Sequence, residues 1–269
     1  MGNKVEVARS EELKKYKGYL IDLDGTTYYG TRRIPSAEAF IHRLNLRNDA
    51  YVFLTNNATR TPQEIVNHLK NDYDLPVSQE NVYSSTEALL SYMKENFRDK
   101  NISVVGERAL HHQVKQAGFR IVNDAQADVV VQGLNRQTNY EELATAAMAI
   151  RNGAAFLVTN ADQTIPTEKG IMPSSGAITA FLEVASGKQA LVAGKPNPLI
   201  VEAALKKLKL SANEVLLIGD KYETDILAGL NAGVDTLLVL TGVTQAEEVA
   251  QLPTPPTYVL NDLSEWEFN

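Results

Sequence analysis

Residues 19–26 have the sequence Tyr-Leu-Ile-Asp-Leu-Asp-Gly-Thr, in which two acids follow a short apolar run. The apolar run Tyr19–Ile21 predicts the end of a buried strand, and the final Gly-Thr ends the strand pattern. Asp22 and Asp24 therefore crowd the carboxyl end of a strand, where open α/β sheets place their ligands. A divalent cation would offset their repulsion, and one acid could attack phosphorus while the other moves a proton. A polar turn after a buried strand is the alternative, and this stretch alone leaves both interpretations open.

The bulk composition is that of a soluble globular protein with one large or two ordinary domains. The chain has 269 residues, of which 44% are hydrophobic, and a formal net charge of −7. It contains no cysteine, so disulfides and thiolate catalysis are excluded. The absence of a basic tract argues against nucleic acid as the main partner. An anionic substrate would need local positive charge or a metal at its site.

The start of the chain predicts neither export nor lipidation. Residues 1–17 are polar and lack the apolar core of a signal peptide. Glu6 stands where an N-myristoylation signal requires Ser or Thr. Because no apolar run is long enough to span a bilayer, we expect a cytoplasmic protein with no membrane partner.

Short apolar runs alternate with helical patterns along the chain, which predicts a parallel sheet wrapped by helices. Helix starts are predicted by capping boxes at Thr61, Ser84, Thr138 and Thr244, and by Asn197-Pro198. The expected strands are Tyr51–Leu54, Ile102–Val105, Asp128–Val131, Ala155–Val158, Ala190–Ala193, Val215–Ile218, Thr236–Leu240 and Tyr258–Leu260.

These strands are too many for one small sheet. We therefore expect an α/β fold with a doubly wound, parallel-sheet (Rossmann-like) core and a smaller α/β unit inserted into it. The predicted core comprises residues 1–78 and 187–269, and the predicted insert comprises residues 79–186.

Three further strand ends carry polar side chains. Thr55 and Asn56 follow one strand, where a hydroxyl and backbone N–H groups could hold phosphate oxygens. Lys195 lies between glycine and proline after another, and its ammonium could neutralise an acid and a transferring phosphoryl group. Asp220 follows a third strand, with Asp225 one helical turn later. An Asx turn, a surface lysine or helix capping would each explain one site alone, but not all of them together.

The four motifs, taken in order, resemble those of the haloacid dehalogenase superfamily of phosphatases. The resemblance covers nearly the whole chain. The interval between the second and third motifs is similar to the branch with a large α/β cap inserted there, which includes NagD-like and 4-nitrophenylphosphatase-like proteins. The motifs are Asp22-x-Asp24-Gly25-Thr26, Thr55-Asn56, Lys195-Pro196, and Gly219-Asp220 with Asp225.

The resemblance implies a role for each core motif. Asp22 matches the nucleophile that is transiently phosphorylated, and Asp24 matches the general acid and base. Thr55 matches the hydroxyl that holds the phosphoryl group, with Asn56 beside it. Lys195 matches the residue that stabilises negative charge and binds phosphate.

The resemblance also implies a Mg²⁺ cofactor. Its ligands would be the carboxylates of Asp22 and Asp220 and the main-chain carbonyl of Asp24. Asp225 is expected in the second shell of the metal or the lysine. The implied partner is a small phosphorylated metabolite, and caps of this type also allow a homodimer.

The insert carries weaker signals. Asn135 stands where relatives often have an acid, and Arg136 could pair with an anionic group of a substrate. Both are candidate specificity residues, and ordinary loop chemistry is an equal alternative. His42, His68, His111 and His112 match no metal-ligand spacing and are expected to be structural or surface residues.

The leading hypothesis is a Mg²⁺-dependent phosphomonoester hydrolase acting through an aspartyl-phosphate. Its substrate would be a sugar phosphate, glycerol phosphate, nucleoside monophosphate or similar metabolite. A haloalkanoate dehalogenase shares the nucleophile but needs neither Mg²⁺ nor Asp24, so the full Asp-x-Asp-Gly-Thr motif argues against it. The remaining alternatives are a phosphomutase and a catalytically weak metabolite-binding or regulatory protein on the same fold, because fold alone does not settle function.

Overall fold

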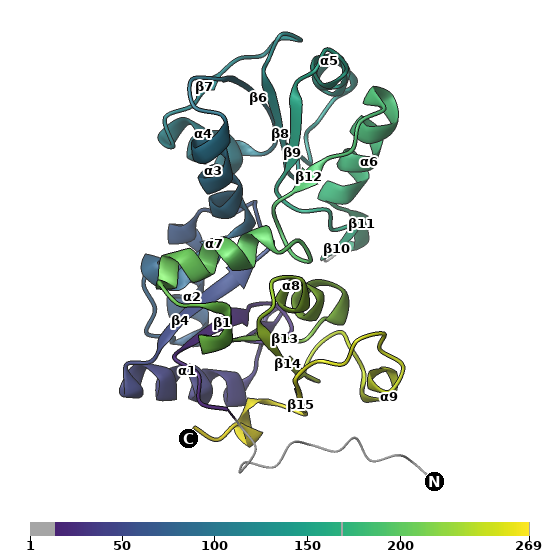
Figure 1. Cartoon of the computed structure of the whole chain (residues 1–269). Helices are drawn as coiled ribbons and strands as arrows, with labels where there is room; N and C mark the ends of the chain where they lie inside the picture. Colours follow the sequence, from purple (N-terminus) through teal and green to yellow (C-terminus); the bar gives the residue numbers. More distant parts are fainter. Residues whose placement is uncertain (1–13, 168, 269) are drawn as a thin grey trace. The chain divides into compact units, whose positions relative to one another are not determined.

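The computed structural model describes residues 14–167 and 169–268 (Figure 1). The prediction that the N-terminus carries no leader falls mostly on residues 1–13, which lie outside the described part. The chain divides into two compact units. Unit 1 contains the residues up to Thr55, Glu64–Tyr83 and the residues from Lys195 onward, whereas unit 2 contains Asn56–Gln63 and Ser84–Gly194. The role of 79–186 as a substrate-specificity domain stays a prediction.

Unit 1 is built on a six-stranded sheet in the order β15-β14-β13-β1-β4-β5. The central strand β1 pairs in parallel with β4 on one side and β13 on the other. After β1, the chain adds β4 and β5 on one side of it and later adds β13, β14 and β15 on the other side. A topological switch point therefore lies between β1 and β13. Ligands of open α/β sheets bind at the carboxyl ends of the strands at such a point. The strands are β1 (Gly18–Asp22), β4 (Ala50–Thr55), β5 (Val82–Ser84), β13 (Val215–Gly219), β14 (Asp235–Val239) and β15 (Tyr258–Leu260).

Both faces of this sheet are covered by apolar packing. Ile21 and Phe53 belong to the core cluster that includes Phe40 of α1 and Ile65 of α2. Their neighbour Leu20, whose side chain points to the opposite face, is also fully buried. Helix α7 contacts β4 and β1, and α8 contacts β14. The helices are α1 (Pro35–Arg47), α2 (Pro62–Tyr73), α7 (Leu199–Leu208), α8 (Leu227–Asn231) and α9 (Ala246–Val249), and a short antiparallel pair is formed by β2 (Tyr28–Tyr29) and β3 (Arg32–Arg33).

Unit 2 has its own parallel sheet of five strands in the order β12-β9-β8-β6-β7. Helices α5 and α6 lie on one side of this sheet and α3 and α4 on the other (Figure 1). Val130, Phe156 and Leu182 are in the cluster that joins the sheet to α5 and α6. The elements are α3 (Ser85–Asn96), β6 (Asn101–Val105), α4 (Arg108–Gln116), β7 (Arg120–Ile121), β8 (Val129–Gln132), α5 (Tyr140–Arg151), β9 (Ala155–Val158), α6 (Ser175–Ser186) and β12 (Leu191–Val192).

An antiparallel hairpin in unit 2, β10 (Thr164–Thr167) with β11 (Gly170–Pro173), was not predicted. The expected strands are otherwise present with shifts of about one residue at their ends, as is usual for strand boundaries. The α/β fold class with parallel sheets is therefore confirmed. None of the helices in the described ranges is long and apolar enough to cross a membrane.

The predicted helix starts are correct in part. Ser84 forms the expected capping box, because its Oγ accepts a hydrogen bond from the Glu87 backbone N–H at 3.2 Å. The prediction for Thr138 is wrong, since the N-cap of α5 is Asn139, whose Oδ1 accepts from the Glu142 N–H at 3.0 Å. Asparagine is at least as good an N-cap as threonine, so the adjacent residue takes the position.

The start of α9 is displaced in the same way. The capping box belongs to Gln245 and Glu248, so the prediction for Thr244 is wrong. The physical reason is that the Thr244 hydroxyl has another partner, the Tyr222 backbone N–H at 2.9 Å. A tertiary hydrogen bond has overridden the local capping preference.

Candidate active site

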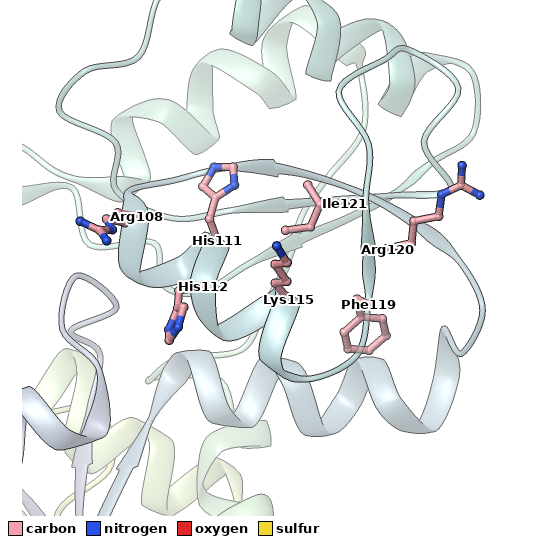
Figure 2. Close-up of a pocket in the computed structure, with 7 residues that line it drawn as sticks. All are labelled: Arg108, His111, His112, Lys115, Phe119, Arg120 and Ile121. Carbon is pink, nitrogen blue, oxygen red and sulfur yellow. The ribbon is translucent and has the colours of Figure 1, made fainter.

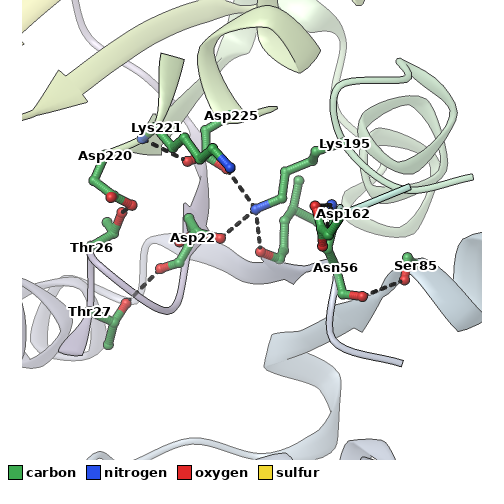
Figure 3. Close-up of polar contacts among 11 residues, drawn as sticks. Asp22, Thr26, Thr27, Asn56, Ser85, Asp162, Lys195, Asp220, Lys221 and Asp225 are labelled. Atoms are coloured by element: carbon green, nitrogen blue, oxygen red, sulfur yellow. Dashed lines mark hydrogen bonds and ion pairs between the residues drawn. The ribbon is translucent and has the colours of Figure 1, made fainter. Parts of the chain in front are cut away.

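The buried ammonium group of Lys195 is the centre of a charged cluster in unit 1 (Figure 3). Its Nζ donates a hydrogen bond to Asp22 Oδ1 at the carboxyl end of β1 and to the Leu54 carbonyl in β4 at 3.0 Å. It also forms an ion pair with Asp225 Oδ1 at 2.7 Å. Burial disfavours the charged lysine, but Asp22 and Asp225 outweigh this effect and raise the pKa of Lys195 above its usual value. Lys195 is therefore a fixed positive charge held by three chain segments.

Asp220 is held by different partners. It follows β13, and its Oδ1 accepts a hydrogen bond from the Thr26 hydroxyl at 3.1 Å. Its Oδ2 accepts from the Val243 backbone N–H at 2.8 Å. Gly25 and Gly242 pack directly on this carboxylate, because a Cβ at either position would lie 2.0–2.3 Å from Asp220 Oδ2. Gly25 of the first motif therefore leaves the space that the Asp220 carboxylate of the fourth motif occupies.

Asp225 is placed by an irregular turn. A π-helical segment spans Tyr222–Ile226, and such segments are frequent at functional sites. Asp225 Oδ2 accepts a hydrogen bond from the Lys221 backbone N–H at 3.1 Å, while Oδ1 contacts Lys195. Its side chain lies against Gly219, where an added Cβ would come within 2.2 Å of the Asp225 Cβ. The turn therefore folds the carboxylate back over the end of β13.

Three carboxylates converge in this cluster. Oxygen atoms of Asp22, Asp220 and Asp225 all lie within 4.8 Å of one another. Burial and the neighbouring Asp225 raise the pKa of Asp22 well above its usual range. The same two causes raise the pKa of Asp220 to about 6. One lysine does not balance three acids, so these oxygens fit the ligand set that a hard divalent cation prefers.

The other core residues of the prediction lie near the ends of β1 and β4. Asp24 is exposed, and its Oδ1 accepts a hydrogen bond from the Gly30 backbone N–H at 3.1 Å. Thr55 ends β4 and is buried. The structure thus brings Asp22, Lys195, Asp220 and Asp225 together, with Asp24 two residues beyond the strand that carries Asp22.

Asn56 is the first residue of unit 2, and it contacts three residues of that unit. Its Nδ2 approaches the Asp162 carboxylate at 3.4 Å, and its carbonyl accepts hydrogen bonds from Asn160 Nδ2 at 2.8 Å and Ser85 Oγ at 3.1 Å (Figure 3). Gly194 also packs here, because a Cβ on it would meet Asn56 Oδ1 at 2.6 Å. The two segments that precede Lys195 and follow Thr55 are therefore joined by one network.

The two candidate specificity residues have partners inside unit 2. Asn135 Nδ2 donates to the Glu142 carboxylate at 3.0 and 3.2 Å. Arg136 Nη1 donates to both carboxylate oxygens of Glu107, at 2.9 and 3.1 Å. These contacts stabilise the loop between β8 and α5. A role of the two residues in substrate selection stays a prediction.

Sequence reasoning missed the contributions of Gly242, Val243 and Thr241 to the site. Thr241 donates from its hydroxyl to the Gly25 carbonyl at 2.6 Å, so the loop after β14 fixes both the first and the fourth motif. The only available signal was the position of Thr241-Gly242 just after a strand of the same sheet. The contact of Asp162 with Asn56 depends on folding and could not be predicted.

Comparison with known proteins supports this arrangement. A family model described as haloacid dehalogenase-like hydrolase matches residues 19–120, and one described as HAD-hydrolase-like matches residues 192–266. A 5'-nucleotidase, YutF, from Bacillus subtilis is 41% identical over 94% of this chain and 98% of its own length. The chain belongs to the haloacid dehalogenase superfamily.

Two further relatives give the same result. An acid sugar phosphatase from Staphylococcus aureus is 42% identical over 94% of this chain and 97% of its own length. The structure of NagD from E. coli K-12 matches with a TM-score of 0.89 and 32% identity, over 95% of this chain and 100% of that one. The predicted membership of the NagD-like branch and the predicted enzyme class, a phosphatase, are confirmed.

Proposed function

We propose that this phosphatase of the haloacid dehalogenase superfamily is a Mg²⁺-dependent phosphomonoester hydrolase that forms an aspartyl-phosphate on Asp22. The observation that supports this proposal best is the placement of Asp22. Its Oδ1 is held by Lys195, whereas its Oδ2 accepts no hydrogen bond within the described residues. One oxygen is thus fixed, and the other is available to attack an electrophile.

In the first half-reaction, Asp22 Oδ2 attacks phosphorus and the bond from phosphorus to the ester oxygen breaks. Asp24 gives its proton to that departing oxygen, so the alcohol leaves neutral. The hydrogen bond from the Gly30 N–H holds Asp24 Oδ1, which leaves the second oxygen to carry the proton. The Thr55 hydroxyl, Asn56 and the Lys195 ammonium would bind the phosphoryl oxygens.

In the second half-reaction, water attacks the phosphorus of the aspartyl-phosphate. Asp24 takes the proton of that water, and the bond between phosphorus and the Asp22 carboxylate oxygen breaks. Inorganic phosphate leaves, and both acids return to their starting states. Dividing a difficult displacement into two easier ones is the general benefit of covalent catalysis.

The metal proposal rests on the donor set. Asp22, Asp220 and the Asp24 main-chain carbonyl would hold Mg²⁺, while Asp225 stays paired with Lys195. When bound, Mg²⁺ would supply positive charge that offsets the acids and the transferring phosphoryl group. The Thr26 and Val243 hydrogen bonds to Asp220 orient this ligand before any metal arrives.

The substrate is proposed as a small phosphorylated metabolite used in the cytoplasm. One relative is named a nucleotidase and another a sugar phosphatase, so both classes belong in a substrate panel. Within the panel, we propose that Asn135 and Arg136 on the inserted unit choose among leaving groups. Replacing both by alanine should change the relative kcat/KM of metabolite esters and spare acetyl phosphate.

The control for that experiment is Arg151→Ala, which removes an exposed charge from α5 of the same unit. It should leave the ranking of substrates unchanged. An equal loss for every ester and for acetyl phosphate would mean that the Asn135 and Arg136 variant acts on folding or chemistry.

The chemical mechanism is tested by trapping the intermediate. Wild-type protein mixed briefly with a phosphate ester and Mg²⁺ should carry a phosphoryl group that hydroxylamine removes. Asp22→Asn should keep its melting temperature within a few degrees, form no such adduct and lose at least about 10⁴-fold in kcat. A folded Asp22→Asn protein with substantial turnover, or full wild-type activity in excess chelator, would contradict the proposal.

A further inference from the structure

A second polar region lies in unit 2, where α4 and β7 border a hollow of about 570 Å³ (Figure 2). Five of its seven lining residues are basic, and none is acidic: they are Arg108, His111, His112, Lys115 and Arg120, together with Phe119 and Ile121. Residues 108–123 contain no Asp or Glu, although the whole chain is acidic. The local charge is therefore opposite in sign to the net charge.

The basic residues are concentrated by helical periodicity. Arg108, His111, His112 and Lys115 have the spacing i, i+3, i+4 and i+7, which places them on neighbouring turns of α4. Leu110 and Val114 between them are buried, so the apolar side of α4 faces the core. Neither Arg108 nor Lys115 has an acid three or four residues away, so helix-stabilising ion pairs do not account for the arrangement.

No acid in the described part of the chain pairs with these groups. Across residues 14–167 and 169–268, none of the five basic side chains forms a hydrogen bond or an ion pair. The nearest acid in the sequence is Glu107, whose carboxylate is occupied by Arg136 at 2.9 Å. Arg108, Lys115 and Arg120 are exposed, unpaired cations, and such charges beside a hollow attract and concentrate anions.

The distance over which the five basic residues are spread indicates the class of ligand. Arg108 and Lys115 are separated by about 10 Å along the helix axis, which is more than one phosphate group can bridge. Figure 2 shows Arg108 and Arg120 at the two ends of the group, with His111 and Lys115 between them. The hollow is also within the size range of small-molecule sites, and arginine suits phosphate and carboxylate oxygens.

We propose that the hollow bordered by α4 and β7 binds a small polyanion that carries at least two phosphate groups. This site is distinct from the cluster around Lys195, because every residue that lines it belongs to unit 2. The buried Phe119 and the half-buried Ile121 give it an apolar wall, which would accept a non-polar part of the ligand.

The test uses the histidines as local reporters. The chain has four, of which His111 and His112 line the hollow and His42 and His68 lie in unit 1. Protein with labelled imidazole rings is titrated with inorganic tripolyphosphate in metal-free buffer while ring NMR signals are recorded. The His111 and His112 signals should shift with saturation, and the His42 and His68 signals should not. Inorganic phosphate should bind at least about tenfold more weakly than tripolyphosphate, because it reaches fewer of the cations.

Two variants with equal charge loss complete the experiment. Lys115→Gln with Arg120→Gln should weaken tripolyphosphate binding by at least about tenfold. Arg151→Gln with Lys188→Gln removes the same charge from exposed positions of unit 2 outside the hollow, and it should change affinity less than about twofold. Equal weakening by both variants, or binding that leaves the His111 and His112 signals unmoved, would overturn the proposal. Shifts of these signals by an RNA duplex but not by tripolyphosphate would also overturn it.

Discussion

Lys195 and Lys115 lie in two regions that differ in how a positive charge is surrounded: the first is buried among acids, and the second is exposed to solvent. Lys195 is 3% exposed and is surrounded by oxygens of Asp22, Leu54 and Asp225. Lys115 is exposed, has no acidic partner in the described structure and borders a hollow with other cations. A buried charge is tolerated only with partners, whereas water stabilises an exposed one without them. We therefore expect the charge of Lys195 to affect stability and catalysis, and the charge of Lys115 to be available for binding a ligand.

The largest expected effect separates the two lysines directly. Lys195→Met leaves the buried Asp225 and the half-buried Asp22 without their counter-charge, so it should lower the free energy of unfolding by about 3–5 kcal/mol. It should also reduce kcat/KM by about 10²–10³-fold, because a fixed charge beside the phosphoryl group is lost. Lys115→Met should change the free energy of unfolding by no more than about 0.5 kcal/mol and leave kcat unchanged. Urea unfolding and steady-state kinetics measure both.

A second substitution checks the cause of that loss. Adding Asp225→Asn to Lys195→Met removes one uncompensated carboxylate, so part of the stability should return while activity stays low. If the two lysine variants are equally stable, or if Asp225→Asn lowers stability further, the contrast between the buried and the exposed region is wrong.

The same contrast explains what the sequence could predict. Asp22, Thr55 and Asp220 lie at the ends of recognisable apolar strands of one sheet, so the rule for parallel sheets placed them at one edge. Lys195 follows β12, a strand of the other sheet, so that rule does not place it beside Asp22. The contacts of Asp220 with Gly242 and Val243 were not predictable, because they depend on how the loop after β14 folds against the end of β13. The helix starts at Thr138 and Thr244 failed for the related reason that neighbouring residues and tertiary partners decided them.

The basic hollow was missed although its signal was present. Compared singly with metal-ligand spacings, His111 and His112 are predicted only to be structural or surface residues. Their periodicity with Arg108 and Lys115, in a segment without acids, was the informative pattern. Arg120 joins the group only because β7 pairs with β6 beside α4, which requires the fold.

A smaller effect is expected from two glycines, one in each region. Gly242→Ala would place a Cβ 2.0 Å from Asp220 Oδ2, so the carboxylate must move. The Mg²⁺ concentration for half-maximal activity should rise about 10–100-fold, as when a partner that orients a metal ligand is lost. Gly118→Ala, between Lys115 and Arg120, meets nothing within 4 Å but has a φ of +93°. It should cost about 1 kcal/mol of stability and leave the Mg²⁺ dependence unchanged. An unchanged Mg²⁺ dependence in Gly242→Ala would remove Asp220 from the metal site.

The smallest expected effect is the response to salt, and it distinguishes the regions without any mutation. The Debye length falls from about 14 Å to about 6 Å between 50 and 300 mM salt, so exposed charges lose most of their reach. Binding of tripolyphosphate to the hollow should therefore weaken several-fold over this range. The pairs of Lys195 are buried and are screened much less, so kcat for an uncharged leaving group should change by less than about twofold. Potassium chloride titrations of the His111 and His112 NMR shifts, and of initial rates with Mg²⁺ in excess, provide the two curves. Parallel curves would mean that the hollow and the Lys195 cluster experience the same solvent screening, and the distinction drawn from their burial would fail.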